Sequence, residues 1–175
     1  DSERIPLTIS DYDREKGTIT IVVQTIGAGT MAMANLKAGD AFHDFVGPLG
    51  QPSEFCMEDL EELKKKKIIF VAGGLGTAPV YPQVKWLHEH GIDADVIVGA
   101  KNKDLLILEE EMKAVAGNLY ITTDDGSYVR KGMVTDVIKD LVNVEGKKYD
   151  VCVAIGPMIM MKFVCKMTET LNIPT

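Results

Sequence analysis

An α/β domain with a parallel sheet, preceded by part of an antiparallel β-barrel, is the fold that this sequence predicts. In residues 68–175, short apolar runs alternate with stretches of helical composition, which is the pattern of strands joined by crossover helices. Residues 1–52 instead contain short β-branched runs separated by glycine and proline turns, as in small barrels. Residues 53–67 are acidic and then basic, and we expect them to connect the two lobes.

The expected barrel part opens with a run that contains Pro6, a residue tolerated at a sheet edge or a bulge. The next run is rich in β-branched residues, which favour strands. Clusters of Gly, Asp and Pro between the runs favour turns. The sequence predicts strands at 4–9, 18–25 and 41–46, turns at 11–17, 26–30, 37–40 and 47–50, and a helical turn at 32–36.

The α/β part alternates regularly along the chain. The expected strands are 68–72, 94–98, 118–122 and 149–154, and the expected helices are 79–90, 104–115, 132–142 and 158–171. Gly91 is expected just beyond the first helix, and Asp104 is expected to cap the second. Such alternation forms a parallel sheet with helices on both faces. Ligands of these sheets bind beyond the carboxyl ends of the strands.

The composition argues against several function classes. A net charge of −7 disfavours non-specific binding of nucleic acid, which needs a basic surface. Cys56, Cys152 and Cys165 have no metal-binding spacing, and their odd number suits reduced thiols in the cytoplasm. The histidines form no metal set, and no apolar run approaches the roughly 18 residues of a membrane span. We therefore expect a cytoplasmic protein with no metal ligands, nucleic-acid partner or membrane span in these residues.

A glycine-rich turn after the first strand of the α/β part carries the clearest functional signal. Gly73, Gly74 and Gly76 let the backbone turn sharply and approach a bound group. Thr77 can cap the helix that follows, and Pro79 is tolerated in its first turn. The free amides and the dipole of a helix N-terminus attract phosphate. The turn therefore predicts a pyrophosphate cradle, with an ordinary strand-turn-helix link as the alternative.

Two departures separate this turn from the usual dinucleotide fingerprint. Pro79 stands where the third glycine belongs, and Lys101 and Lys103 follow the second strand, where an acid would hold the ribose hydroxyls. It is not a P-loop either, because no Gly-Lys-Ser/Thr follows. A simple Rossmann dehydrogenase is a poor fit. Lys101 and Lys103 could hold an adenosine phosphate, including a 2′-phosphate, or could be ordinary solvated lysines.

Two further loops are expected at the same edge of the sheet. One contains Asp124, Asp125 and Gly126, whose polar groups could bind the sugar hydroxyls or the nicotinamide of a dinucleotide. Without the other loops, an Asx turn before a helix is the favoured interpretation of this segment. The other loop contains Gly156 and Pro157, directly after the last strand.

The barrel part offers a possible second phosphate site. Arg4 with Thr8 could hold a phosphate-bearing cofactor, because a guanidinium suits paired contact with phosphate oxygens. The amides of residues 27–30 and the Thr30 hydroxyl offer similar contacts. Taken alone, each segment is an ordinary strand or turn. Since no Gly-x-Ser-x-Gly elbow or other hydrolytic set accompanies these cradles, they point to cofactor chemistry, and we assign no catalytic side chain.

In combination, these segments resemble the ferredoxin reductase-like superfamily. Within it, the chain is most similar to the electron-transfer subunits of dihydroorotate dehydrogenase, sulfide dehydrogenase, NAD-dependent ferredoxin:NADP oxidoreductase and the hydrogenase gamma subunits. The resemblance covers nearly the whole chain, and the order of its segments is more specific than any one of them. The segments are Arg4–Thr8, Gly27–Thr30, Gly47–Gly50, Gly73–Pro79 and Thr123–Ser127.

In that superfamily, a flavin-binding barrel precedes a nicotinamide-nucleotide domain. The resemblance implies that the FAD contacts come from Arg4, Pro6, Leu7, Thr8, Gly29 and Thr30. It implies that the nicotinamide-nucleotide contacts come from Gly74, Gly76, Thr77, Pro79, Gly156 and Pro157. With the loops described above, the predicted cofactor-binding set also includes Gly73, Lys101, Asp124, Asp125 and Gly126.

The chain departs from the superfamily pattern at three places. Ile155 replaces the cysteine of a Cys-Gly-Pro turn, so any role of that thiol near the flavin is absent. The flavin motif already begins at Arg4, and the chain stops at Thr175, before the cysteine-rich segment that holds a [2Fe-2S] cluster in similar subunits. We therefore expect a fragment whose barrel lacks its opening strands and exposes sheet edges. The [2Fe-2S] cluster is expected in a C-terminal segment that this chain does not contain.

The resemblance implies an oxidoreductase subunit. NAD(P)H would bind at the glycine turn and pass a hydride to FAD, and electrons would leave singly through an iron-sulfur centre to a partner subunit in a heteromeric complex. The alternative is a nucleotide-sensing or assembly module with the same fold and no electron transfer. Lys101 and Lys103 lean toward NADP, but the superfamily includes NAD users, so the sequence does not choose between the two nucleotides.

Overall fold

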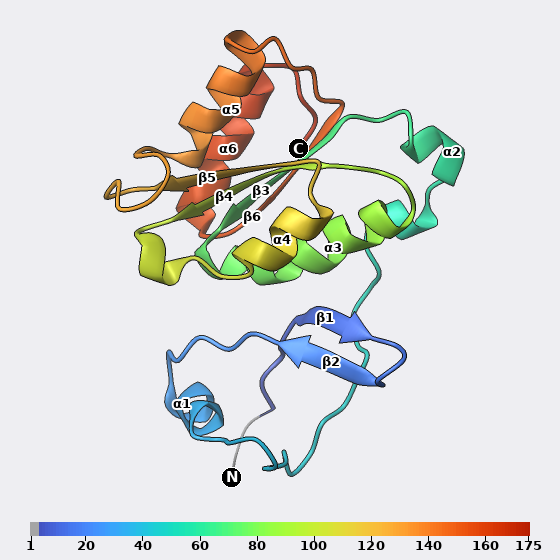
Figure 1. The fold of residues 1–175 in the computed structure, drawn as a ribbon, viewed down its shortest axis with the longest axis vertical. Helices are drawn as coiled ribbons and strands as arrows, with labels where there is room; N and C mark the ends of the chain where they lie inside the picture. Colours follow the sequence, from blue (N-terminus) through green and yellow to red (C-terminus); the bar gives the residue numbers. More distant parts are fainter. Residues whose placement is uncertain (1–3) are drawn as a thin grey trace.

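The protein has two lobes in a computed structural model that describes residues 4–175 (Figure 1). One lobe is a four-stranded sheet with helices on both faces, and the other contains a two-stranded antiparallel sheet and a short helix. The predicted parallel sheet with helices on both faces is confirmed. No helix among the described residues is long and apolar enough to cross a bilayer.

The large sheet is parallel throughout, in the order β5-β4-β3-β6. Its strands are β3 (Ile68–Gly73), β4 (Asp95–Ala100), β5 (Asn118–Thr123) and β6 (Val151–Ile155). The chain moves outward from β3 to β4 and β5, and then returns to β6 on the other side of β3. This reversal makes the carboxyl ends of β3 and β6 the switch point, where sheets of this kind open a crevice for ligands.

Alternate residues of β3 enter two apolar cores, because side chains of a strand point to opposite faces. Ile68, Phe70 and Ala72 pack in the core beneath α3 and α4, whereas Ile69 and Val71 pack in the core beneath α5 and α6. The helices are α3 (Thr77–Glu89), α4 (Glu109–Val115), α5 (Val134–Asn143) and α6 (Met158–Thr170). Every residue of β3 is buried, which explains its uninterrupted apolar sequence.

The ends of α3 confirm one capping prediction and correct another. Gly91 has a left-handed backbone, with φ of +78°, just beyond the end of the helix, as expected. Thr77, however, is the first residue of α3, and the N-cap position belongs to Gly76. Glycine can take this position because the turn before the helix is held by the backbone and by the Thr77 hydroxyl rather than by a capping side chain.

The second predicted cap is also wrong. Asp104 lies in a short 3-10 turn, η3 (Lys103–Leu105), and α4 begins only at Glu109. The local cap is Asn102, whose side-chain oxygen accepts a hydrogen bond from the Leu105 amide at 3.2 Å. Asn102 therefore stabilises the short turn η3, and α4 begins four residues after that turn ends.

The small lobe contains less regular structure than the sequence predicts. Its elements are β1 (Ile9–Asp13), β2 (Thr18–Ile21) and α1 (Ala28–Ala34). The predicted strands at 4–9 and 41–46 are wrong, apart from Ile9, and the predicted strand at 18–25 stops at Ile21. A strand needs a partner, and among the described residues β1 and β2 pair only with each other. The predicted turn at 11–17 shortens because β1 continues to Asp13, and the helical segment begins at Ala28 rather than 32.

The connecting residues attach to the α/β lobe. They form η1 (Glu54–Met57) and α2 (Leu60–Leu63), and the buried Phe55 and Leu63 join the core under α3. The small lobe meets the large one where β1 packs against α3, which lies between the hairpin and the large sheet (Figure 1). The exact domain boundaries at 52 and 67 stay a prediction.

Candidate functional site

The glycine turn lies at the carboxyl end of β3, where the sheet switches direction. A short 3-10 turn, η2 (Gly74–Gly76), leads directly into α3. Gly74 has φ of +53°, a left-handed conformation that glycine adopts without strain. The buried Thr77 donates its hydroxyl proton to the Gly74 carbonyl oxygen at 2.9 Å. Thr77 therefore holds the shape of the turn from beneath.

Two of the glycines allow this turn to contact the turn after β6. A Cβ atom on Gly76 would lie 2.2 Å from the Ile155 carbonyl oxygen. A Cβ on Gly156 would lie 3.1 Å from both N and Cα of Gly73. Only glycines permit so close an approach of backbone to backbone. The structure thus brings together the two predicted nucleotide segments, the glycine turn and the Gly156-Pro157 turn.

Met160 of α6 fills the space behind these two turns. Its sulfur would lie 2.4 Å from a Cβ on Gly73, and its methyl carbon 2.7 Å from a Cβ on Gly156. By contrast, a Cβ on Gly74 would meet nothing within 4 Å. Gly74 and the exposed Leu75 therefore form the open side of the turn, and a ligand can approach there.

The loops after β4 and β5 are joined by their backbones. The Asp124 amide donates to the Ala100 carbonyl at 3.0 Å, and the Asp125 amide donates to the Lys101 carbonyl at 3.2 Å. The Lys103 ammonium instead lies 4.9 Å from the centre of the Tyr128 ring, a cation-π contact. Of the two predicted lysines, the structure leaves Lys101 beside the acidic loop and turns Lys103 toward Tyr128.

Asp125 forms the Asx turn that was the alternative interpretation of this loop. Its carboxylate accepts the Ser127 amide at 2.9 Å, and the hydrogen bonds from Ser127 lower the pKa of Asp125. Gly126 has φ of +79°, which completes the turn. Asp124 is exposed beside it. A role of Asp124 and Asp125 in binding a sugar or nicotinamide stays a prediction.

The two predicted flavin segments are neighbours in space. A Cβ on Gly29 would lie 2.6 Å from the Ile5 side chain, so α1 packs against the run that begins at Arg4. The Thr30 hydroxyl accepts the Ile26 and Gly27 amides at 2.9 and 3.0 Å, which stabilises the start of α1. The Arg4 guanidinium pairs with Asp44 at the surface. Pro6 and Thr8 are exposed and Leu7 is half-buried.

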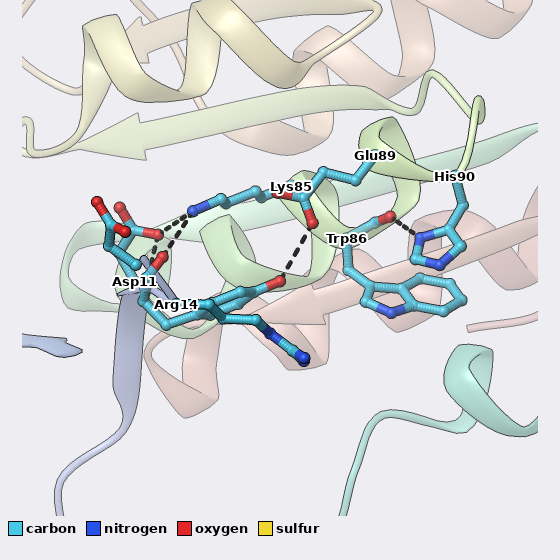
Figure 2. Close-up of a pocket in the computed structure, with 8 residues that line it drawn as sticks. Asp11, Arg14, Lys85, Trp86, Glu89 and His90 are labelled. Carbon is cyan, nitrogen blue, oxygen red and sulfur yellow. Dashed lines mark hydrogen bonds and ion pairs between the residues drawn. The ribbon is translucent and has the colours of Figure 1, made fainter. Parts of the chain in front are cut away.

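A cavity of about 560 Å³ lies between β1 and the C-terminal half of α3 (Figure 2). Six of its lining residues are Asp11, Arg14, Lys85, Trp86, Glu89 and His90. The sequence pattern pointed to none of them as site residues, because they come from segments far apart in the chain. The spacing of Tyr81, Lys85 and Glu89 at four-residue intervals was the only available signal, since it places them on one face of the helix.

Comparison with known proteins bears directly on the α/β lobe. Residues 70–166, from β3 into α6, match the family described as "Oxidoreductase NAD-binding domain". The chain belongs to this family. The matched range contains the glycine turn, the loops after β4 and β5, and the Gly156-Pro157 turn. These family residues therefore form an NAD-binding oxidoreductase domain.

Relatives of this family extend the similarity to the small lobe. The "Uncharacterized protein in adh 3'region" of Clostridium beijerinckii is 66% identical over 99% of this chain, which spans 58% of that protein. A "Dihydroorotate dehydrogenase B (NAD(+)), electron transfer subunit homolog" of Thermotoga maritima is 40% identical over 98% of this chain and 57% of its own length.

A solved structure shows the same arrangement. A chain from the NADH-dependent reduced ferredoxin-NADP oxidoreductase structure superimposes with a TM-score of 0.78 and 37% identity, over 95% of this chain and 57% of that one. This protein thus spans little more than half the length of the relatives that it matches. The similarity supports the predicted ferredoxin reductase-like fold across both lobes.

Proposed function

We propose that this chain is part of a flavoprotein subunit that passes electrons from NAD(P)H to FAD and on to a partner. The observation that carries the proposal is the glycine turn at the switch point of an NAD-binding oxidoreductase domain, in backbone contact with the turn after β6. The similarity to electron-transfer subunits supports the role of a relay. When bound, the nicotinamide supplies a hydride and the flavin accepts it and can release single electrons.

The glycine turn fits a dinucleotide pyrophosphate. Gly74 exposes backbone without a side chain to obstruct it, and the N-terminus of the 13-residue helix α3 favours negative charge. Gly73, Gly76 and Thr77 set the depth and the shape of the turn. Gly156 and Pro157 would lie beside the nicotinamide, because they adjoin the turn at the same edge of the sheet. No side chain here acts as an acid or base, so the protein's part is to bind and orient.

The small lobe fits a second phosphate-bearing cofactor. Arg4 is mostly exposed, and its surface pair with Asp44 is of a kind worth about 0–1 kcal/mol, so the guanidinium can exchange that partner for a phosphate. Thr8 lies in the same segment, and Gly29 and Thr30 lie beside it across the Ile5 contact. We propose that these residues, with Pro6 and Leu7, contact FAD.

NAD rather than NADP is the nucleotide that we propose. A 2′-phosphate needs a strong positive site beside the ribose, and Lys103 is turned toward Tyr128. Lys101 remains, but its backbone is bonded to the loop that carries Asp124 and Asp125. Asp124 and Asp125 add negative charge to that loop, which disfavours a doubly charged phosphate there. A steady-state comparison should give a lower KM for NADH than for NADPH, and the opposite order would contradict this part of the proposal.

The iron-sulfur centre belongs, in this proposal, to a partner subunit or to another segment of the polypeptide. The sequence has three cysteines, all free thiols in the structure, whereas a [2Fe-2S] cluster takes four. Free thiols also fit the cytoplasm, which we propose as the location. A heteromeric complex with a catalytic or iron-sulfur subunit is the corresponding assembly.

Anaerobic reduction of the full-length polypeptide, reconstituted with FAD, tests the proposal. Addition of NADH should bleach the flavin absorbance, and Gly74→Ala should raise the Kd for NADH at least ~10-fold because the new methyl projects from the open side of the turn. Gly91→Ala is the matched control, since Gly91 also has positive φ and open surroundings but lies at the far end of α3. Nucleotide binding without flavin reduction would instead favour a sensing or assembly module.

A further inference from the structure

A set of polar contacts joins the two lobes at β1 and α3. We infer that Lys85 and Glu89 of α3 are positioning residues, which hold β1 so that the flavin lobe is aligned with the nucleotide lobe for hydride transfer. We call these contacts the α3 clamp, formed by Asp11 and Tyr12 of β1 with Lys85 and Glu89 of α3. The inference rests on the proposed function and names residues that act through the two cofactor segments rather than on the cofactors.

Lys85 makes the central contacts of the α3 clamp (Figure 2). Its ammonium donates to Asp11 Oδ1 at 2.6 Å and to the Tyr12 carbonyl oxygen at 3.0 Å. It also lies 4.6 Å from the centre of the Tyr12 ring. The Lys85 and Asp11 side chains are 19% and 31% exposed, so water screens this pair less than a pair at the open surface. The hydrogen bond from Lys85 to Asp11 is the main cause of a raised Lys85 pKa.

Glu89 holds the same strand one helical turn further on. The Tyr12 hydroxyl donates to Glu89 Oε2 at 3.2 Å, and partial burial together with Glu89 raises the Tyr12 pKa. Because Lys85 and Glu89 are four residues apart, they face β1 together. The α3 clamp therefore contacts both the backbone and the side chains of β1. These contacts restrict rotation as well as translation of β1 relative to α3.

The position of the α3 clamp in the chain ties it to both proposed cofactor segments. Thr77, which follows the glycine turn, begins the helix that carries Lys85. Eight residues of helix span about 12 Å, so continuous helix, which includes Pro82, connects Lys85 to the glycine turn. On the other side, Asp11 follows the proposed flavin contact Thr8 after only two intervening residues. The α3 clamp therefore joins two residues that each lie close in the chain to one of the proposed cofactor segments.

Apolar packing contributes little to the orientation of the small lobe. Within the described residues 4–52, Ser10 is the only buried residue, and it too lies in β1. So few buried side chains in these residues contribute little shape complementarity against α3. The polar contacts of Lys85 and Glu89 therefore decide how β1 sits on α3. Since a misplacement of about 1 Å can slow a reaction on the order of 10²-fold, that orientation bears directly on the rate.

The experiment uses the full-length polypeptide with FAD and measures flavin reduction by NADH in stopped flow. Lys85→Met keeps the unbranched shape and most of the length of the side chain and removes its charge. We expect the limiting rate constant to fall at least ~10-fold, while the Kd for NADH and the FAD content change less than ~2-fold. Lys85→Arg should recover most of the rate, because a guanidinium can still pair with Asp11.

Lys147→Met is the matched control. Lys147 also forms a partly buried ion pair, with Asp95 at 2.9 Å, but it contacts neither β1 nor the glycine turn, which lies at the other end of the strands. This variant should lower the melting temperature and leave the rate constant unchanged, which separates positioning from general destabilisation. Tyr12→Phe is a milder second variant that loses only the hydrogen bond to Glu89, so it should slow reduction by a smaller factor.

A wild-type rate constant in Lys85→Met would overturn the inference alone. Equal loss of rate and of NADH affinity would also overturn it, because the variant would then have damaged the nucleotide site. If Lys85→Met does not fold, Tyr12→Phe decides, and a wild-type rate constant in that variant counts against the clamp. Absence of any reduction in the unsubstituted protein would instead overturn the proposed function, and the inference with it.

Discussion

The two lobes differ in how much of their chain is buried. Every residue of β3 in the α/β lobe is buried, whereas no residue of β2 in the small lobe is. Phe70 is 0% exposed and Leu49 is 79% exposed, although both are large and apolar. The α/β lobe carries its own two cores, while the small lobe depends on contact with α3. The proposed nucleotide site therefore lies on a well-packed scaffold, whereas the proposed flavin site lies on residues that α3 supports.

Hydrogen exchange on the intact chain tests this difference between the lobes most directly. An isolated two-stranded hairpin is marginal in stability, whereas central strands of a doubly covered sheet open only with global unfolding. Amides of β3 and β4 should exchange on the order of 10³-fold more slowly than those of β1 and β2. Equal protection in both lobes would show that the chain is one cooperative unit.

Truncation of an apolar side chain should reduce the free energy of unfolding more in the α/β lobe than in the small lobe. Phe70→Ala should cost about 3–5 kcal/mol of unfolding free energy, because it opens a cavity in the core under α3. Leu49→Ala should stay within about 0.5 kcal/mol, since its side chain is already in water. Urea denaturation followed by circular dichroism measures both values. A large cost for Leu49→Ala would reveal packing in the small lobe and contradict the contrast.

Two glycine-to-alanine substitutions, one in each lobe, test whether the backbone is packed more closely in the α/β lobe. Gly76→Ala forces apart the turns after β3 and β6, since the new Cβ meets a carbonyl oxygen, and should cost about 1–3 kcal/mol or more. Gly17→Ala in the hairpin meets no atom within 4 Å and strains only a φ of +63°, so it should cost about 1 kcal/mol. Thermal melts rank the two variants, and the reverse ranking would count against close contact of the turns.

A polar cluster at the amino edge of the sheet predicts an acid-sensitive part of the α/β lobe. Burial opposes ionisation of Asp95, but hydrogen bonds from Tyr149, Asn118 and Lys147 outweigh it and lower the pKa of Asp95. A depressed pKa in the folded state means stability that is complete above the unfolded value of 3.8 and is lost as pH falls through the folded pKa.

Asp95→Asn removes that contribution. It should lower the unfolding free energy by about 1–3 kcal/mol at pH 7, because three donors lose a charged partner. The gap between variant and wild type should shrink as pH falls below about 4. Urea midpoints at pH 7 and pH 3 provide the measurement. A gap that stays constant over this range would mean that Asp95 is not held in its charged form by the fold.

Much of the α/β lobe was predictable because its signals are local. The apolar run at 68–72 identified β3, glycine at position 91 identified the end of α3, and the glycine turn identified the candidate site. Predictions that needed long-range pairing were less successful. Residues 41–46 have the composition of a strand, yet they pair with no strand among the described residues. The cap at Asp104 was wrong because Asn102 competes for the same loop.

Local sequence specifies the alternation of strands and helices and the place of the glycine turn, because periodicity and backbone freedom are properties of neighbouring residues. Three contacts emerge only when the chain folds: Gly76 with the turn after β6, Lys103 with Tyr128, and α3 with β1. These facts depend on how elements pack across long stretches of chain. A contact such as Lys85 with Asp11 joins residues 74 positions apart, and no local pattern encodes it.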